Sequence, residues 1–440
     1  MLMFFLPEAH ALRAFPEQMK HIFTIFVLAA LVSLAAPSSA GCTSAIITRT
    51  ADGRPLIWKH RDTGNLDNSI RHFKGERYSF VGLVNSSSPG GEVWAGVNTA
   101  GFAVINTASY CLKDDDVPSS MMDREGILMY RALEICATVE DFRHFLDTLA
   151  RPAGVEANFG CIDACGGAAW FETGNYTYVM RDLAFSGRGF DVVTNFSWSG
   201  DRKRWRGVER WNTAQWIFNG MARRGSLGGL HPLDIVDSLS RSYRQSVAGV
   251  DLVRDSSAFL AGTTGIVPDL DFIPRRSTSA SVVIQGVAAG EDPSGAVLWA
   301  ALGYPAVSVA VPVPVSLEDH VPEALSGFPV SGPETFCGLS TRLKDTYVFP
   351  SGGVSNASMY VDLRYVLGGM PGTASTLSCC RRAEREIRAE FEKGYSRFAA
   401  GIITESEYLS LYDRISEKFF GMYSAAFSDY VSGTAPVSTM

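Results

Sequence analysis

The sequence lacks several features that most often reveal a protein's function. Its 39 Lys and Arg and 46 Asp and Glu are mixed along 440 residues, without the basic tract that binds nucleic acid through phosphates. Beyond the N-terminal segment no run of 18 apolar residues occurs, so a stable membrane span is not expected. These absences argue against nucleic-acid binding and against a membrane-embedded activity.

Familiar catalytic motifs are also missing. Five of the seven histidines follow the N-terminal segment, and none lies in a recognisable catalytic segment. There is no Gly-x-Ser-x-Gly turn, no phosphate-binding glycine loop and no His-Glu-x-x-His sequence. Eight cysteines are present, but Cys161 and Cys165 are four residues apart and no second pair completes a zinc site. We therefore expect no metal and no cofactor, while disulfide pairing stays open.

The N-terminal segment has the composition of a secretory signal peptide. Met19-Lys20-His21 is basic, residues 22–36 are apolar and residues 37–41 are small. Met1 to Gln18 fit this pattern poorly, so we expect translation to start at Met19. The sequence predicts that residues 1–41 are a removable leader and that the protein is exported to the periplasm or the extracellular space.

The periodicity of apolar residues predicts strand pairs with helices between them. Strands are expected at residues 42–50, 54–60, 93–98, 102–107, 161–180 as a hairpin, 191–196, 279–287, 296–302 and 307–315. Helices are expected at residues 123–149, 205–223, 231–245 and 379–430. Prolines in and just before the last strand predict an edge position or an exit from the sheet. This order favours an α+β protein over strict βαβ alternation.

The position of Cys42 makes it the strongest candidate for a catalytic residue. It follows Ala40-Gly41 at the expected cleavage point and begins a predicted strand. A mature N-terminal cysteine has a nucleophilic thiol and an α-amine, of reference pKa about 8, that can take the thiol proton without a histidine base. Two alternatives stay open, a structural cysteine that is buried or disulfide-bonded and a lipoprotein in which Cys42 is lipidated.

Four short motifs follow one another from this cysteine onward. They are Gly41-Cys42-Thr43-Ser44, Trp58-Lys59-His60-Arg61-Asp62-Thr63, Gly96-Val97-Asn98-Thr99-Ala100-Gly101-Phe102-Ala103 with Asn106 after it, and Val193-Thr194-Asn195-Phe196. In this order they resemble the choloylglycine hydrolase and acyl-coenzyme A:6-aminopenicillanic acid acyltransferase superfamily of N-terminal-nucleophile hydrolases. The resemblance covers residues 42 to about 315. It implies a four-layer αββα sandwich, with Cys42 at the end of a central strand between two antiparallel sheets.

The resemblance also implies a role for each matching residue near the nucleophile. Cys42 would attack an amide carbonyl, and Asp62 would hold its α-amine or thiol region in place. Arg61 would sit beside the nucleophile, with Lys59 as the alternative basic residue. Asp62 has a structural alternative as a turn or cap residue.

Two asparagines and an arginine complete the implied site. Asn106 and Asn195 would donate hydrogen bonds to the developing oxyanion, although both could instead bridge backbone groups at strand ends. Arg210 would match a late active-site arginine, with Arg204 and Arg206 as rivals. A surface position is the ordinary alternative for each of these arginines.

The expected activity is hydrolysis of a linear, non-peptide C–N amide in a small-molecule N-acyl substrate, through a thioester on Cys42, or transfer of the acyl group to an amine. A dipeptidase of the same clan and a non-catalytic ligand-binding lipoprotein remain alternatives. Residues 42–378 would form the catalytic domain, and residues 379–440 a helical segment packed on it or extending it. Aromatic residues near the predicted pocket suggest a partly apolar acyl group: Phe73, Tyr110, Phe196 and Trp198. The sequence leaves a homo-oligomer open.

Overall fold

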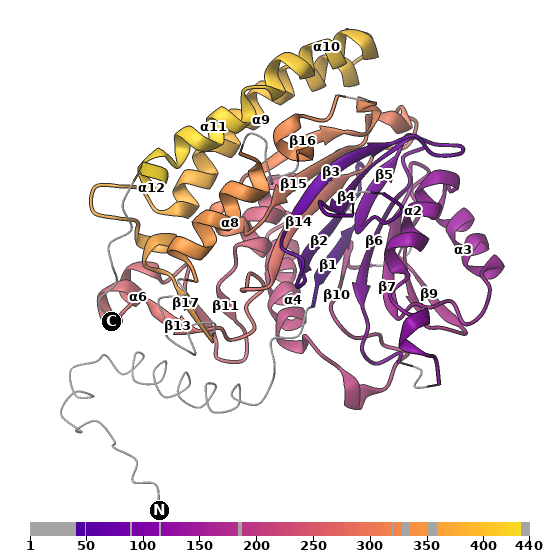
Figure 1. Ribbon diagram of the computed structural model, residues 1–440, viewed down its shortest axis with the longest axis horizontal. Helices are drawn as coiled ribbons and strands as arrows, with labels where there is room; N and C mark the ends of the chain where they lie inside the picture. The colour runs from indigo at the N-terminus through magenta and orange to yellow at the C-terminus, as the bar shows by residue number, and fades with distance from the viewer. Residues whose placement is uncertain are drawn as a thin grey trace, which may run out of the picture.

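Two stacked antiparallel sheets form the centre of the molecule (Figure 1). The computed structural model describes residues 41–432 apart from 49, 89, 114–115, 184–186, 319, 328–333 and 350–358. The predicted leader therefore lies outside the described residues, apart from Gly41. Within the described ranges, no helix is long and apolar enough to cross a membrane.

The first sheet has six strands and begins at the residue after Cys42. Its order is β10(Phe190–Val193), β1(Thr43–Ile47), β2(Leu56–Asp62), β14(Thr278–Gln285), β15(Val297–Leu302) and β16(Ala310–Pro314). The turn between β1 and β2 contains Asp52-Gly53, and Gly53 has a φ of 75°, which glycine adopts without strain. β16 is an edge strand, as its prolines predict.

The second sheet is a seven-stranded meander in chain order. It consists of β3(Asn68–Phe73), β4(Phe80–Asn85), β5(Ala95–Asn98), β6(Ala103–Ala108), β7(Ala157–Ile162), β8(Ala168–Thr173) and β9(Tyr178–Asp182). Side chains alternate between its faces, as in any strand. Ala103 and Ile105 join the core between the sheets, whereas Val104 joins the core on the outer face.

Helices cover the outer face of each sheet. α2(Glu125–Ile135) and α3(Val139–Thr148) pack on the seven-stranded sheet. The six-stranded sheet is covered by α4(Val208–Arg223), α5(Pro232–Ile235), α8(Phe336–Tyr347) and α9(Thr376–Ala399). Two further helices, α10(Glu405–Ser416) and α11(Phe419–Ala426), pack on α9. The short helix α12(Ser428–Ser432) contacts α11. The fold is thus α+β with layers in the order αββα, as expected.

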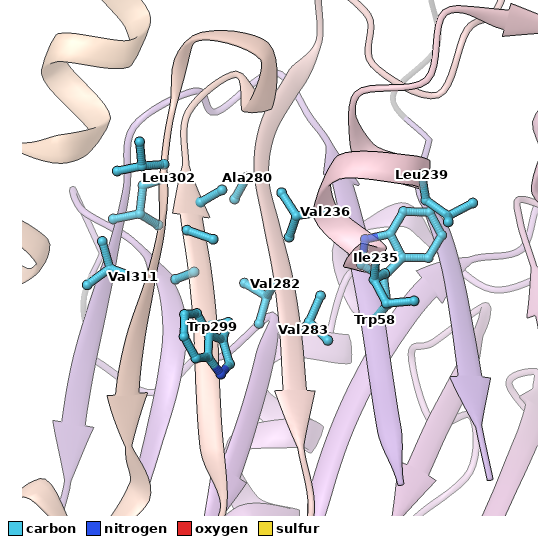
Figure 2. Packing of buried hydrophobic residues seen from close by; sticks show 14 of the residues in the cluster. Trp58, Ile235, Val236, Leu239, Ala280, Val282, Val283, Trp299, Leu302 and Val311 are labelled. Carbon is cyan, nitrogen blue, oxygen red and sulfur yellow. The ribbon is translucent and has the colours of Figure 1, made fainter. Parts of the chain in front are cut away.

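The outer face of the six-stranded sheet shows how this packing is specified. Figure 2 shows Trp58 of β2 and Val283 of β14 against Ile235 and Val236, where α5 and the turn after it lie on the sheet. The indole N–H of Trp58 donates to Ser240 Oγ at 3.0 Å, so this large side chain is buried with its polar atom satisfied.

Two expectations need correction. β1 is second from the sheet edge rather than central, because β10 pairs on its outer side. The helix expected at 231–245 is shorter: α5 continues as a wider helical turn at Val236–Ser240, and the strand β11(Arg244–Gln245) then pairs with β12(Val250–Asp251). The chain leaves the helical path at Arg241, whose side chain is fully buried against groups distant in sequence.

Other elements carry weaker sequence signals. β3 and β4 were not expected, because β3 mixes polar and apolar residues without clear alternation and β4 is a short apolar run that periodicity alone does not assign to a strand. Further elements outside the two sheets include the pair β13(Ile266–Pro268) and β17(Tyr360–Asp362) and the short helices α6(Ser256–Gly262) and α7(Glu323–Ser326). α9 begins at Thr376, and its buried residues share one core with the six-stranded sheet.

Candidate active site

Cys42 lies immediately before β1 and is buried, with 8% of its surface exposed. Two residues later on the same side of the strand, Ser44 Oγ is 2.9 Å from Thr107 Oγ1 of β6 in the facing sheet. By this alternation the Cys42 side chain is directed to the space between the sheets. On the adjacent strand β2, Lys59 lies opposite Ser44 and His60 lies opposite Thr43.

Arg210 of α4 holds the backbone of Cys42. Its Nη1 donates to the Cys42 carbonyl at 2.7 Å and to Thr43 Oγ1 at 2.9 Å. Its Nη2 donates to Asn195 Oδ1 at 2.8 Å, and its Nε to Asp271 Oδ1 at 2.9 Å. Arg210 is only 2% exposed, so the contacts form in a weakly solvated site. Of the three rival arginines, Arg210 is the one that reaches Cys42.

Asp62 is linked to the other side of Cys42 through Arg275, which the sequence analysis missed. Arg275 Nε donates to Asp62 Oδ2 at 2.8 Å, and Nη2 donates to the Gly41 carbonyl at 3.0 Å. Thr278 Oγ1 donates to Asp62 Oδ1 at 2.7 Å. The available signal was an Arg-Arg pair just before the predicted strand at residue 279. Two adjacent arginines on the protein surface would give the same sequence pattern, so the pair did not indicate a site.

The chain approaches Cys42 through a narrow space at Gly41. A Cβ at position 41 would lie 2.4 Å from Asn195 Oδ1, 2.8 Å from Arg275 Nη2 and 3.1 Å from Arg210 Nη2, so a larger residue would displace these side chains. Gly41 therefore lies within the same group of side chains that contacts the Cys42 carbonyl. The peptide bond between residues 41 and 42, where cleavage is predicted, is enclosed by polar groups.

Asn195 follows β10, and its orientation is set by Arg210. A guanidinium group can only donate, so Oδ1 must face Arg210 and Nδ2 must face the other way. One Nδ2 hydrogen goes to the Ala108 carbonyl at 2.9 Å, at the end of β6. A second hydrogen on Nδ2 remains for another acceptor.

Asn106 of β6 contacts Lys59 of β2. Lys59 Nζ donates to Asn106 Oδ1 and, at 2.8 Å, to the Trp94 carbonyl. Because the ammonium can only donate, this contact turns Asn106 Nδ2 away from Lys59 and leaves it as a donor. Complete burial lowers the pKa of Lys59 to about 7, against a smaller opposing effect of Cys42.

Arg61 lies near Cys42, but its hydrogen bonds run to other residues. It donates to Asn68 Oδ1 and, at 2.9 Å, to Asn85 Oδ1, and it stacks over Trp94 at 4.9 Å from the ring centroid. Burial lowers its pKa to about 10. The structure thus connects Asn195 to the Cys42 backbone through Arg210 and Asp62 to the Gly41 carbonyl through Arg275, and it pairs Asn106 with Lys59 on β2.

The cysteines, the possible metal ligands and the two rival arginines give no second site of this kind among the described residues. All eight cysteines are described, and none forms a disulfide. Among the described residues, no three His, Cys, Asp or Glu side chains form a group that could hold a metal ion. Arg204 and Arg206, the rivals of Arg210, line a surface pocket with Tyr110 instead.

Comparisons with known proteins give structural matches only. No protein-family model and no curated protein matches the chain. The fold is similar to penicillin V acylase from Agrobacterium tumefaciens (13% identity, 62% of this chain and 86% of that chain, TM-score 0.35). It is also similar to two variants of conjugated bile acid hydrolase from Clostridium perfringens, both at 11% identity. One match covers 59% of this chain and 89% of that chain with a TM-score of 0.35, and the other 67% and 98% with a TM-score of 0.36.

Proposed function

We propose that this chain is an exported amide hydrolase of the N-terminal-nucleophile type, with the Cys42 thiol as its reactive group. Its substrate would be an N-acyl compound with a linear, non-peptide C–N amide. The observation that carries this proposal is the enclosure of the Gly41–Cys42 junction. Arg210 binds the Cys42 carbonyl, Arg275 binds the Gly41 carbonyl, and a side chain at position 41 would displace the groups that surround it.

Removal of the leader after Gly41 would turn this junction into a catalytic group. The backbone nitrogen of Cys42 would become an α-amine beside the thiol that it serves. The carboxylate of Asp62 lies one arginine away from this position and would hold Arg275 beside the new amine. Export and activation would then be the same event.

The reaction follows from these positions. The α-amine takes the thiol proton, and the thiolate adds to the amide carbonyl carbon. The C–N bond then breaks, and the leaving amine takes the proton from the α-ammonium, which leaves a thioester on Cys42. Water adds to the thioester with the amine as base, the C–S bond breaks, and the acid and the free thiol are released.

Two donors are available for the negative oxygen that forms in each addition. They are Asn106 Nδ2, which Lys59 turns away from itself, and the second hydrogen of Asn195 Nδ2, whose orientation Arg210 sets. Preorganised donors of this kind typically lower a barrier by about 3 kcal/mol each.

The burial of Cys42 argues against the lipoprotein alternative. A lipidated cysteine carries acyl chains that must reach a membrane, whereas Cys42 is 8% exposed and is followed directly by the fully buried strand β1. No flexible tether separates it from the sheet.

Mass spectrometry and a variant series test the proposal. The exported protein is expected to begin at Cys42 with a free amine and thiol, and to release amine from at least one of a panel of bile-acid conjugates, N-acyl amino acids, β-alanyl amines and penicillins. Cys42→Ala is expected to lower turnover at least 1,000-fold, on the order of the loss when a nucleophile is removed, with an unchanged melting temperature. The matched control is Cys165→Ala, which removes the exposed free thiol and should keep full activity.

Two results would contradict the proposal. One is a diacylglyceryl group on Cys42, because it blocks both thiol and amine. The other is full amide hydrolysis by the Cys42→Ala protein. Release of amino acids from dipeptides, with no cleavage of acyl amides, would instead select the dipeptidase of the same clan.

A further inference from the structure

A second pocket, of about 770 Å³, lies where α9 covers the six-stranded sheet, and its walls also include the β1–β2 turn and the segment before α5. Gln285, at the end of β14, lines this pocket, whereas Thr278, at the start of the same strand, donates to Asp62. Seven residues at about 3.3 Å each place the pocket about 23 Å from Asp62. The pocket is therefore separate from the candidate active site. Because α9 lies beyond residue 315, the resemblance to a known superfamily implies nothing about it.

Aromatic side chains form the floor of this second pocket. Trp299 pairs with Val283 across the sheet, so both side chains lie on the outer face of the sheet (Figure 2). The rings of Phe391 and His231 each meet the Trp299 ring edge to face, with 5.6 Å and 4.8 Å between centroids. Tyr395, one turn further along α9, stacks on Phe391 at 5.4 Å. The packed rings hold one another in place and give the pocket a rigid apolar base.

Three hydrogen-bond donors line the pocket from three elements. His231 Nδ1 accepts from the Leu233 N–H at 3.1 Å, so the ring proton is on Nε2, which lies 3.6 Å from Glu392 Oε1. Burial, with a smaller effect of Arg388, lowers the pKa of His231 to about 3, so the ring is neutral at ordinary pH. Arg388 donates from Nε to Glu392 Oε1 at 2.8 Å. Within the described residues, neither the terminal nitrogens of Arg388 nor the side-chain amide of Gln285 has a hydrogen-bond partner.

The positive charges of the pocket already have carboxylate partners. Arg54 of the β1–β2 turn donates to Glu291 at 2.7 Å and 2.9 Å, and Arg388 pairs with Glu392. Asp52 is exposed at the rim, where its Oδ1 accepts from the Arg54 N–H. A charged ligand would lose hydration in this pocket without meeting a buried, unpaired counter-charge. The arrangement of charges therefore favours an uncharged ligand.

We propose that this second pocket binds a small, uncharged aromatic compound that carries an acceptor oxygen. The ring of the ligand lies on the aromatic floor, and its oxygen accepts from His231 Nε2, whose orientation is set by the bond to the Leu233 N–H. The volume falls within the range of about 300–1,000 Å³ that is usual for small-molecule sites. Cys42 takes no part in this binding, so the pocket does not depend on the proposed hydrolase function.

Calorimetric titration of the full exported protein with four indoles tests the class of ligand. Tryptophol is uncharged and has an acceptor oxygen, 3-ethylindole lacks the oxygen, tryptamine is a cation and indole-3-acetate is an anion. Tryptophol is expected to bind with a Kd of about 1 mM or tighter. It should bind at least about threefold more tightly than each of the others, since one hydrogen bond contributes about two- to tenfold. Equal or tighter binding of either ion, or of 3-ethylindole, would overturn the proposed class.

Two substitutions on α9 test where tryptophol binds. Ala399→Trp places a large side chain in the pocket from an exposed position, so it should weaken tryptophol binding at least about tenfold. Ala389→Trp is the matched control, because it makes the same change at an exposed position of the same helix outside the pocket lining. It should leave the Kd unchanged. Undiminished binding by Ala399→Trp, or an equal loss in Ala389→Trp, would overturn the assignment to this pocket.

His231→Asn tests the donor without filling the pocket. The Asn side-chain oxygen can replace Nδ1 as the cap that accepts from the Leu233 N–H, whereas the Nε2 proton is lost. Tryptophol should then bind about three- to tenfold more weakly, while the affinity for 3-ethylindole stays the same. Unchanged tryptophol binding, or an equal loss for both indoles, would contradict a hydrogen bond from His231 to the ligand oxygen.

Discussion

At the scale of single residues, Asp271 joins the two arginines that enclose the Gly41–Cys42 junction. Its Oδ1 accepts from Arg210 Nε at 2.9 Å and from Arg275 Nη1 at 2.6 Å. Its backbone has a φ of 57°, which is uncommon outside glycine and is kept only where the surroundings determine it. Arg210 and Arg275 therefore act as one unit, with one arginine on each side of the predicted cleavage point.

Lys59, in the same site, makes the free energy of unfolding depend on pH. The pKa of its side chain is about 7 in the folded protein and about 10.5 in the unfolded chain. Between these values the unfolded state holds one more proton than the folded state, so Lys59 makes stability rise as pH rises from 7 to 10.5. Below pH 7 Lys59 is protonated in both the folded and the unfolded state, so its contribution to stability no longer changes with pH.

Replacement of Lys59 by Met tests this assignment. From pH 7.5 to 9.5, the free energy of unfolding of the wild type should rise more steeply than that of Lys59→Met, by up to about 1.4 kcal/mol per pH unit. Urea unfolding at a series of pH values gives both slopes, and groups shared by the two proteins cancel. Parallel slopes would mean that Lys59 stays protonated and is not the residue of lowered pKa beside Cys42.

At the scale of elements, α9 is attached to the six-stranded sheet by a fully buried ion pair. Glu384 of α9 accepts from Arg241 Nη1 at 2.9 Å and Nη2 at 2.6 Å. Arg241 also donates to the Pro305 and Ser308 carbonyls, and Glu384 accepts from the Ala310 N–H. Every polar atom of the pair thus has a partner, so the pair specifies how the C-terminal helices dock.

We expect Glu384→Gln to destabilise the protein by about 3–5 kcal/mol, because it leaves the Arg241 charge buried without a counter-charge. Glu386→Gln, on the exposed side of the same helix, is the control and should change stability by less than about 0.5 kcal/mol. Denaturant unfolding measures both. A cost below 1 kcal/mol for Glu384→Gln would show that water or a rearranged helix satisfies Arg241.

At the scale of the whole molecule, the C-terminal helices belong to the same core as the sheets. Leu377, Ile387 and Phe391 of α9 are almost fully buried in the cluster that contains the sheet residues Trp299 and Val311. Each such side chain contributes roughly 1.5–3 kcal/mol through burial. Their sum is comparable to the 5–15 kcal/mol that stabilises a typical protein.

A chain that ends at Ser375 is therefore expected to aggregate or to unfold without a cooperative transition, although it contains every candidate site residue. Circular dichroism melting and size-exclusion chromatography test this. Thr404→Ala, which only removes the cap of α10, is the graded comparison and should cost about 1 kcal/mol while the protein stays folded. A truncated chain with native melting behaviour would show that residues 42–375 fold independently.

The sequence predicted some parts of the fold better than others. The strand pair on either side of Asp52-Gly53 and the helices α2 and α3 were predicted, because turn chemistry and apolar periodicity are local signals. β3 and β4 were not predicted, and the helix after His231 was predicted to be longer than it is. β3 and β4 are consecutive strands that pair with each other but carry no clear alternation, and after His231 the burial of Arg241 against Glu384 overrides the local pattern.

The sequence by itself determined the candidate nucleophile and the order of motifs around it, because the predicted leader, its predicted cleavage point and a turn each depend on contiguous residues. Only the tertiary structure decided between Arg210 and its rivals, introduced Arg275 and Asp271, and brought the three donors of the second pocket together. Arg210 lies 168 residues from Cys42 and Arg275 lies 213 residues from Asp62 in the chain, and no local pattern records which charged side chain will face which backbone once the layers stack.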